Sequence, residues 1–156
     1  MAFIMTEFKN LVVAPTAKTP QIELNQLTGE LIFSGRSIPE NAASVYEPVF
    51  NWVQEYILKA RPTTNLRLNM EYFNTSSSIW LAKIFKVLGK IKEPDYVLIV
   101  HLYFHIDEFN EMEIDDLKDV LAPITDIIHD SIPSVGIKVY GTDDNGKIIK
   151  DTLVFI

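Results

Sequence analysis

Cysteine is absent from this chain of 156 residues. The absence excludes disulfide bonds, thiolate zinc sites, iron–sulfur clusters and a cysteine nucleophile. It is compatible with the reducing cytoplasm, where we expect the protein to be located. Basic residues are also scarce, because 14 Lys and Arg stand against 21 Asp and Glu and give a net charge of −7. Nucleic-acid-binding proteins present a face rich in Lys and Arg to the phosphates, so we expect no nucleic-acid partner.

Long hydrophobic runs are lacking as well. The apolar run from Tyr96 to Phe104 is much shorter than the ~20 residues that cross a bilayer, so no membrane partner is expected. Glu7 soon interrupts the apolar start of the chain, which argues against a signal peptide. Hydrophobic residues nevertheless make up 47% of the chain, enough for one buried core, and no repeat or break in composition marks a boundary. We therefore expect a single domain over residues 1–156.

Familiar motifs of enzymes and metal sites are missing. No serine lies in a Gly-x-Ser-x-Gly turn, and the six glycines form no phosphate-binding loop. On a strand, His101 and His105 lie about 13 Å apart, from four steps of about 3.3 Å, too far for one metal ion to bridge. The sequence therefore indicates neither a hydrolase nor a nucleotide-binding protein, and we expect no metal and no cofactor.

Two acidic patterns invite a metal-site interpretation. The turn Asp143-x-Asn145-Gly146 resembles part of a calcium loop but lacks the other ligand positions, so a hairpin turn is favoured. The second pattern is an acidic run that suits a solvated helix face, since the helix dipole favours carboxylates near its start. An electrostatic partner surface or a pair of catalytic acids stays open for this run, which consists of Asp107, Glu108, Glu111, Glu113, Asp115, Asp116 and Asp119.

The sequence does contain a regular succession of strand and helix patterns. Alternating residues at 21–24 and 30–34 predict a β-hairpin. Ser37, followed three residues later by Glu40, predicts a helix that Ser37 caps. Pro48 lies within the apolar stripe of this helix and predicts a kink or a late start of its regular part.

Strands and helices continue to alternate down the chain. Apolar residues recur at every second position from Leu66 to Tyr72, which predicts a strand with one apolar face, and residues 96–104 predict a strand covered on both faces. The other predicted elements are a helix carrying Leu81, Ile84, Phe85 and Leu88 that ends at Gly89, a helix over 108–129 interrupted at Pro123, and a hairpin of 136–140 and 148–156. This order predicts an α/β fold with a single mixed β-sheet and helices packed on it.

A cluster of hydroxyls, Thr75-Ser76-Ser77-Ser78 after Asn74, precedes the second predicted helix. Asn, Ser and Thr are common helix caps, but four consecutive hydroxyls exceed what one cap needs. A hydroxyl at the positive end of a helix dipole also tolerates a phosphoryl group. The cluster is therefore either a cap alone or a cap with a phosphoacceptor.

Three blocks of residues, in this order and spacing, resemble the SiaC family of bacterial regulatory phosphoproteins. They are Thr19-Pro20, Gly35-Arg36-Ser37-Ile38-Pro39-Glu40-Asn41, and Tyr72-Phe73-Asn74-Thr75-Ser76-Ser77-Ser78. The likeness is strongest over residues 19–104, and it leaves residues 107–156 as a divergent C-terminal helix and hairpin. Arg36 and Ile79 depart from the residue types expected at their positions.

The resemblance implies a fold similar to anti-sigma-factor antagonists (STAS-like domains) and no catalysis by the protein itself. It implies that a dedicated kinase phosphorylates a threonine, matched here by Thr75, and that a phosphatase removes the phosphate. The unphosphorylated form would bind and activate a diguanylate cyclase and so control cyclic-di-GMP output. The expected partner-binding residues lie at the two helix starts and comprise Ser37, Pro39, Glu40, Asn41, Asn74, Ser76, Ser77 and Ile79.

Several alternatives stay open at this point. Ile79 falls outside the apolar stripe of its helix, so it is either an exposed contact or is packed under the C-terminal hairpin. A homodimer through an exposed sheet edge is equally compatible with the sequence. The competing functional hypothesis is a domain or enzyme that binds a small anionic molecule between the two helix N-termini.

Overall fold

A computed structural model describes residues 8–113 and 129–155 of the chain. All of its strands join one seven-stranded sheet, in the spatial order β1-β2-β3-β4-β5-β6-β7. The bounds are β1 Leu11–Val13, β2 Gln21–Asn25, β3 Glu30–Ser37, α1 Ala42–Tyr56, the 3₁₀ turn η1 Ile57–Lys59, β4 Thr63–Phe73, α2 Thr75–Leu88, β5 Val97–His105, α3 Ile106–Glu111, β6 Ser134–Thr142 and β7 Ile148–Phe155.

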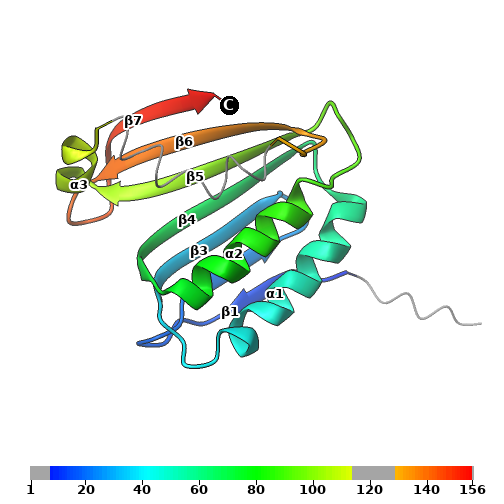
Figure 1. The fold of residues 1–156 in the computed structure, drawn as a ribbon, viewed down its shortest axis with the longest axis horizontal. Coiled ribbons are helices and arrows are strands. Elements are labelled where there is room, and N and C mark those ends of the chain that lie inside the picture. The colour runs from blue at the N-terminus through cyan, green and yellow to red at the C-terminus, as the bar shows by residue number, and fades with distance from the viewer. Residues whose placement is uncertain (1–7, 114–128, 156) are drawn as a thin grey trace, which may run out of the picture.

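The sheet is mixed, as predicted. The pairs β3–β4, β4–β5 and β5–β6 are parallel, and the pairs toward both edges are antiparallel. Helix α1 connects β3 to β4 and α2 connects β4 to β5, and Figure 1 shows the two helices side by side on one face of the sheet. The connections β3–α1–β4 and β4–α2–β5 both lead to the next strand in the same direction across the sheet. Because such connections are right-handed, both helices lie on the same face. This arrangement brings the N-termini of α1 and α2 to the same edge.

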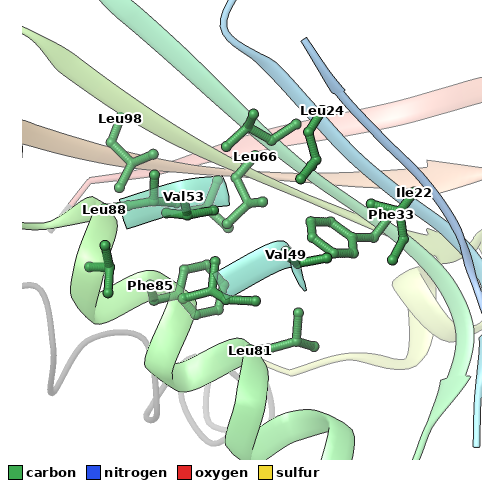
Figure 2. Close-up of a cluster of buried hydrophobic side chains, with 14 of the residues drawn as sticks. Ile22, Leu24, Phe33, Val49, Val53, Leu66, Leu81, Phe85, Leu88 and Leu98 are labelled. Atoms are coloured by element: carbon green, nitrogen blue, oxygen red, sulfur yellow. The ribbon is translucent and has the colours of Figure 1, made fainter. Parts of the chain in front are cut away.

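The core lies between this helix layer and the sheet. The predicted N-terminal hairpin is present, and its pairs Ile22–Phe33 and Leu24–Leu31 point their side chains into the core. Leu81, Ile84, Phe85 and Leu88 of α2 are buried in the same core cluster, so the predicted apolar stripe of this helix is confirmed, and Figure 2 shows three of them, Leu81, Phe85 and Leu88. The parallel strands contribute further buried residues, among them Leu66, Leu98 and Val100.

The start of α1 differs from the prediction. The helix begins at Ala42, and its cap is Asn41, whose Oδ1 accepts the N–H of Ser44 at 3.4 Å. Ser37 is the last residue of β3 and caps no helix. Pro48 neither ends α1 nor delays its start, because the helix runs from Ala42 to Tyr56.

A β-bulge explains why the predicted apolar face of β4 fails at Tyr72. The register between β3 and β4 shifts between Gly35 and Arg36, so Arg36 pairs with Tyr72 and Ser37 with Phe73. One extra residue reverses which side chains face the helices beyond that point. Tyr72 is consequently 60% exposed, while Phe73 takes the helix side of the sheet.

The C-terminal third confirms the prediction in part. The hairpin β6–β7 is present, and its turn closes through Gly146, which has the positive φ of 80° that favours glycine. The predicted helix at 108–129 begins earlier, as the short α3, and residues 114–128 with Pro123 lie outside the described residues. Among the described residues, α1 and α2 cover one face of the sheet (Figure 1), and Ile99, His101 and Tyr103 of β5 lie on the other face, partly or fully buried. The three-residue β1 was not predicted.

Candidate functional site

The hydroxyl cluster forms the N-terminus of α2, directly after β4. Asn74 caps the helix: its Oδ1 accepts the N–H of Ser77 at 3.0 Å, the hydroxyl of Ser77 at 2.7 Å and the hydroxyl of Ser76 at 3.0 Å. The amide of Asn74 donates in turn to the carbonyl oxygen of Ser37 at 2.9 Å. One side chain therefore satisfies one free N–H of the first turn and two of its hydroxyls, and it does not engage the hydroxyl of Thr75.

Ser37 and Ser77 form a buried contact beneath this cap. Their hydroxyl oxygens lie 2.8 Å apart, the Ser37 hydroxyl also bonds the hydroxyl of Tyr46 in α1, and all three side chains are fully buried. Burial raises the pKa of Tyr46, so its phenol stays protonated and can donate. The three residues join β3, α1 and α2 at one point.

This burial separates the predicted partner-binding residues into buried and exposed members. The side chains of Ser37, Ser77 and Pro39 are buried in this structure, and their part in partner binding stays a prediction. Asn74 is half-buried, and the amide of its side chain lies 3.5 Å from the carbonyl oxygen of Pro39. These residues lie beneath the surface and connect the two helix starts.

Thr75 is the first residue of α2 and is exposed. Within the described residues its hydroxyl makes no hydrogen bond, in contrast to Ser76, Ser77 and Ser78. The first turn of α2 contains no acidic residue. An uncompensated helix N-terminus attracts negative charge, so the surroundings of Thr75 suit a phosphoryl group.

Exposed apolar side chains flank Thr75 on both sides. Ile79, one turn further along α2, is 53% exposed, and Phe73, at the end of β4, is 47% exposed. Ile79 is therefore a surface residue, and the alternative that packed it under the C-terminal hairpin is wrong. An apolar groove of about 260 Å³ begins at Phe73 and Ser78 and runs beside α2 along Ala82.

The start of α1 adds an exposed polar rim to this surface. Glu40, whose side chain is 86% exposed, accepts a hydrogen bond from Lys18 at 3.1 Å. The cap Asn41 is exposed next to it. The exposed members of the predicted partner-binding set are therefore Glu40, Asn41, Ser76 and Ile79, and they lie around the predicted phosphoacceptor Thr75.

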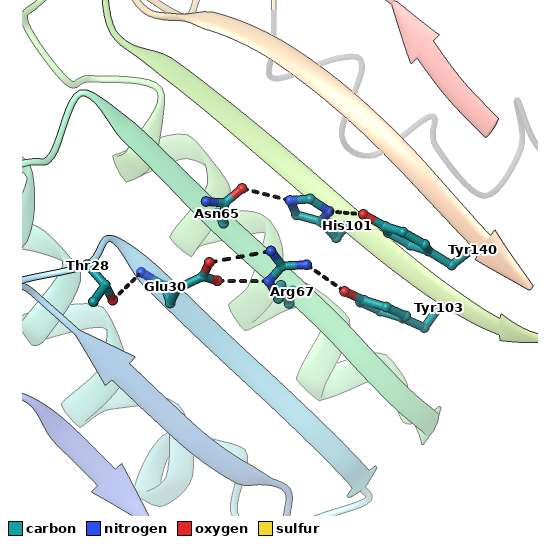
Figure 3. A network of polar contacts seen from close by, with 7 residues as sticks. All are labelled: Thr28, Glu30, Asn65, Arg67, His101, Tyr103 and Tyr140. Atoms are coloured by element: carbon teal, nitrogen blue, oxygen red, sulfur yellow. Dashed lines mark hydrogen bonds and ion pairs between the residues drawn. The ribbon is translucent and has the colours of Figure 1, made fainter. Parts of the chain in front are cut away.

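The two histidines of β5 occupy separate polar networks. His101 lies on the face of the sheet opposite α1 and α2, between Asn65 at 2.8 Å and the Tyr140 hydroxyl at 2.6 Å (Figure 3). Burial, with the nearby Arg67 guanidinium, lowers the pKa of His101 to about 4. The ring is therefore neutral near pH 7, with Nε2–H donating to the amide oxygen of Asn65.

Arg67 anchors the same face of the sheet. Its guanidinium donates to Glu30 at 2.8 Å and to the Tyr103 hydroxyl at 2.7 Å, and the Glu30 contact raises the pKa of Arg67 (Figure 3). The ring of Tyr103 stacks on Tyr140 with centroids 4.5 Å apart. No buried side-chain nitrogen or oxygen of these described residues lacks a hydrogen-bond partner, which is what a structural network needs. No local pattern in the sequence predicts this network, because its members come from four strands.

His105 ends β5 and caps α3. Its Nδ1 accepts the amide of Asp107 at 3.2 Å, and its Nε2 lies 2.7 Å from the Asp144 carboxylate. That contact raises the pKa of His105. Asp107 and Glu108 lie in the first turn of α3, where the helix dipole favours them, and Asp115, Asp116 and Asp119 fall outside the described residues.

The remaining acidic candidate is the turn between β6 and β7. The Asp143 carboxylate accepts the amides of Asn145 and Lys147, both at 2.9 Å. Asp143 therefore closes the hairpin turn, as predicted. Residues 8–113 and 129–155 contain no group of three or more His, Asp or Glu side chains placed to hold a metal ion, and no helix there is long and apolar enough to cross a membrane.

Solved structures with this fold are known. A crystal structure of apo-SiaC from Pseudomonas aeruginosa matches with a TM-score of 0.61 at 22% sequence identity, over 83% of this chain and 98% of that chain. A second structure of SiaC from the same organism matches with a TM-score of 0.56 at 26% identity, over 71% and 91%. A third match, with a TM-score of 0.63 at 22% identity over 83% and 99%, comes from the crystal structure of the diguanylate cyclase SiaD in complex with its activator SiaC, from Pseudomonas aeruginosa.

Sequence comparison agrees with these structures. An uncharacterized protein of Pseudomonas aeruginosa strain UCBPP-PA14 is 29% identical over 102 residues, which cover 65% of this chain and 79% of the relative. The expected likeness to anti-sigma-factor antagonists stays a prediction. The family model described as "SiaC family regulatory phosphoprotein" matches residues 13–128, most of the chain, and the chain therefore belongs to the SiaC family.

Proposed function

We propose that this protein is a non-catalytic regulatory switch whose binding to a signalling partner is controlled by phosphorylation of Thr75. The observation that carries the proposal is the state of Thr75: it is exposed, it begins α2, and its hydroxyl makes no hydrogen bond within the described residues. Membership in a family of regulatory phosphoproteins supports it.

The surroundings of Thr75 give the switch a physical mechanism. Phe73 and Ile79 present apolar surface on either side of it, and a partner that covers both must also cover Thr75. A phosphoryl group there adds about −1.5 to −2 charge at pH 7. Covering it removes a hydrated anion from water, which costs several kcal/mol unless the partner supplies cations. Phosphorylation would therefore prevent binding.

The buried contacts under the cap keep this surface in one conformation. The Ser37–Ser77 contact and the Asn74 cap fix the first turn of α2 relative to β3. The acceptor and its apolar flanks are therefore presented on a rigid frame, and binding requires little ordering of the surface.

The partner in this proposal is a diguanylate cyclase. SiaC, which shares this fold, has been crystallised as the activator of the diguanylate cyclase SiaD. By analogy, the unphosphorylated form of this protein would bind and activate such a cyclase, and a cognate kinase and phosphatase would set its phosphorylation state. The expected cytoplasmic location belongs to the same proposal, because a protein kinase draws its phosphoryl group from cytoplasmic ATP.

Phosphorylation itself is tested by intact mass. Wild-type protein, Thr75→Ala and Ser76→Ala are incubated with ATP and the Ser/Thr kinase encoded by the same genome. We expect a gain of about 80 Da, one phosphoryl group, in wild type and Ser76→Ala and none in Thr75→Ala. Ser76 is the matched control because it is the neighbouring exposed hydroxyl. A phosphorylated Thr75→Ala protein, or an active kinase that leaves wild type unmodified, contradicts the assignment.

A further inference from the structure

The outer face of α2 carries a row of lysines that continues from the surface around Thr75. Lys83 and Lys86 follow Ile79 at spacings of four and three residues, so these residues share one face of the helix, and Lys90 follows just beyond the C-cap Gly89. All three side chains are exposed. Residues 75–92 contain four lysines and no Asp or Glu, in a chain whose net charge is −7.

A second group of lysines lies beyond the C-terminal end of α2. A cavity of about 330 Å³ between η1 and the loop that leads to β5 is lined by Lys59, Lys90 and Lys92. Glu93 is the one carboxylate among its lining residues. Lys90 belongs to both groups, so the lysines form a continuous basic area, which we call the lysine surface: Lys59, Lys83, Lys86, Lys90 and Lys92.

The positive charge of this area is not neutralised within the described part of the chain. None of the five lysines forms an ion pair or a side-chain hydrogen bond with another described residue. The ammonium of Lys83 lies 4.5 Å from the centre of the Trp80 ring, which leaves its charge available. Elsewhere in the described residues, Lys18, Arg36, Arg67 and Lys138 each pair with a carboxylate, whereas Lys9, Arg61, Lys147 and Lys150 form no ion pair and are scattered over other elements.

The helix dipole accounts for only part of this pattern. Lysine in the last turn of a helix is stabilised by the negative end of the dipole, and Lys86 is the basic residue in the last turn of α2. Lys83 lies before that turn, and Lys90 and Lys92 lie outside the helix. The helix dipole therefore does not account for the positive charges of Lys83, Lys90 and Lys92.

We propose that the lysine surface, together with Ile79, binds an acidic segment of the regulated partner. Charge complementarity selects a partner rich in Asp and Glu, and the exposed Ile79 in line with the lysines selects an apolar anchor beside those acids. A helix laid along α2 would meet both features. The inference rests on the proposed function only in taking this segment to belong to the partner that Thr75 controls.

The lysine surface and Thr75 have separable roles in this arrangement. Lys83 lies eight residues along the helix from Thr75 and Lys86 eleven, which places them about 12 and 17 Å away at 1.5 Å per residue, and Lys90 lies beyond the helix end. The Debye length at physiological ionic strength is about 8 Å. A phosphate on Thr75 therefore acts mainly on partner groups near Ile79, while the lysines supply affinity and association rate at the other end.

The test uses NMR titration of ¹⁵N-labelled full-length protein with a synthetic amphipathic helix of about 18 residues, five turns, that carries Glu beside two Leu. A peptide with Lys in place of Glu is its control. We expect the acidic peptide to shift the amide signals of Ile79, Lys83 and Lys86, and the shifts to weaken at high salt. The substitutions Lys83→Gln, Lys86→Gln and Lys90→Gln together should weaken binding about tenfold or more. The same change at Lys9, Lys147 and Lys150, exposed lysines elsewhere, should have little effect.

Three results would overturn the inference: no shift on α2, shifts centred on another surface, or equal weakening by the control substitutions. The same protein is also titrated with inorganic phosphate and, separately, with phosphatidylglycerol vesicles. A response to either that matches the response to the acidic peptide would assign the surface to small anions or to membranes instead. A thermal melt of each variant confirms folding. The titration requires neither kinase nor phosphate, so its failure is distinct from a failure of Thr75 phosphorylation.

Discussion

The hydroxyl of Ser37, the last residue of β3, lies 2.8 Å from the hydroxyl of Ser77 in the first turn of α2, and both side chains are fully buried. Two segments forty residues apart in the chain are joined there, directly beneath the exposed Thr75. The hydroxyls that flank Thr75 in the sequence therefore differ in role: Ser77 holds the helix in place, and Thr75 faces solvent.

Substitution of Ser77 by Ala should destabilise the protein by about 1–3 kcal/mol, because buried partners lose a hydrogen bond and cannot recover it from water. The Ser77 hydroxyl contacts Asn74 Oδ1, the Ser37 carbonyl and the Ser37 hydroxyl, all of which would be affected. Urea denaturation measures the change. Ser76→Ala, at an exposed neighbour, should cost less than about 0.5 kcal/mol. Equal stability of the two variants would show that the buried contact contributes nothing.

Asn74→Ala should lower the free energy of unfolding by about 1–2 kcal/mol, since the cap satisfies the amide of Ser77 and two hydroxyls. Asn74→Asp keeps the accepting oxygen and should retain most of the stability. The same denaturation experiment compares the two variants. If Asp proves as damaging as Ala, the side-chain oxygen is not the stabilising group.

His101 should make the protein less stable in mild acid. The folded pKa of about 4 lies below the ordinary value of 6.5, so between these values the unfolded state binds more protons and the free energy of unfolding falls as the pH is lowered. Between pH 6.5 and 4 the free energy of unfolding should fall by about 2–3 kcal/mol. His101→Gln cannot titrate and should show a shallower decline from pH 6.5 to 4 in denaturant melts. A decline as steep as that of wild type would rule out His101 as its source.

His105 should titrate in the opposite sense. The Asp144 carboxylate, 2.7 Å away, raises its pKa, with smaller contributions from Asp107 and Glu108. The folded state therefore holds the proton more tightly than the unfolded state: the stabilisation is complete below pH 6.5 and is lost as the pH rises through the raised value. NMR titration of the imidazole signals measures this pKa, and Asp144→Asn should bring it back toward 6.5. A value for wild type at or below 6.5 would exclude the ion pair.

Local patterns in the sequence were sufficient to predict most helices and strands, but not the residues at which one element ends and the next begins. The turn at Gly146, the apolar stripe of α2 and the position of Thr75 at a helix start each depend on residues close together in the chain, and each was predictable. Ser37 and Glu40 match a capping box, yet β3 continues to Ser37 because its hydroxyl finds partners in α1 and α2. Such partners lie far away in sequence.

The surface around the site likewise depends on contacts between segments that are far apart in the sequence. The bulge at Gly35 moves Tyr72 off the helix side of the sheet, and a bulge depends on how two strands pair. The lysine surface could have been noticed as a run of basic residues without acids at 75–92, but its accessibility depends on which face of α2 the sheet covers.

The central claim, that phosphate on Thr75 controls partner binding, is tested most directly by calorimetric titration of the diguanylate cyclase encoded by the same genome. One sample is unmodified protein, and the other is protein quantitatively phosphorylated on Thr75. We predict that the unmodified protein binds and that phosphorylation weakens binding at least about 100-fold, close to 3 kcal/mol. Equal affinity of the two forms for the cyclase would contradict the account.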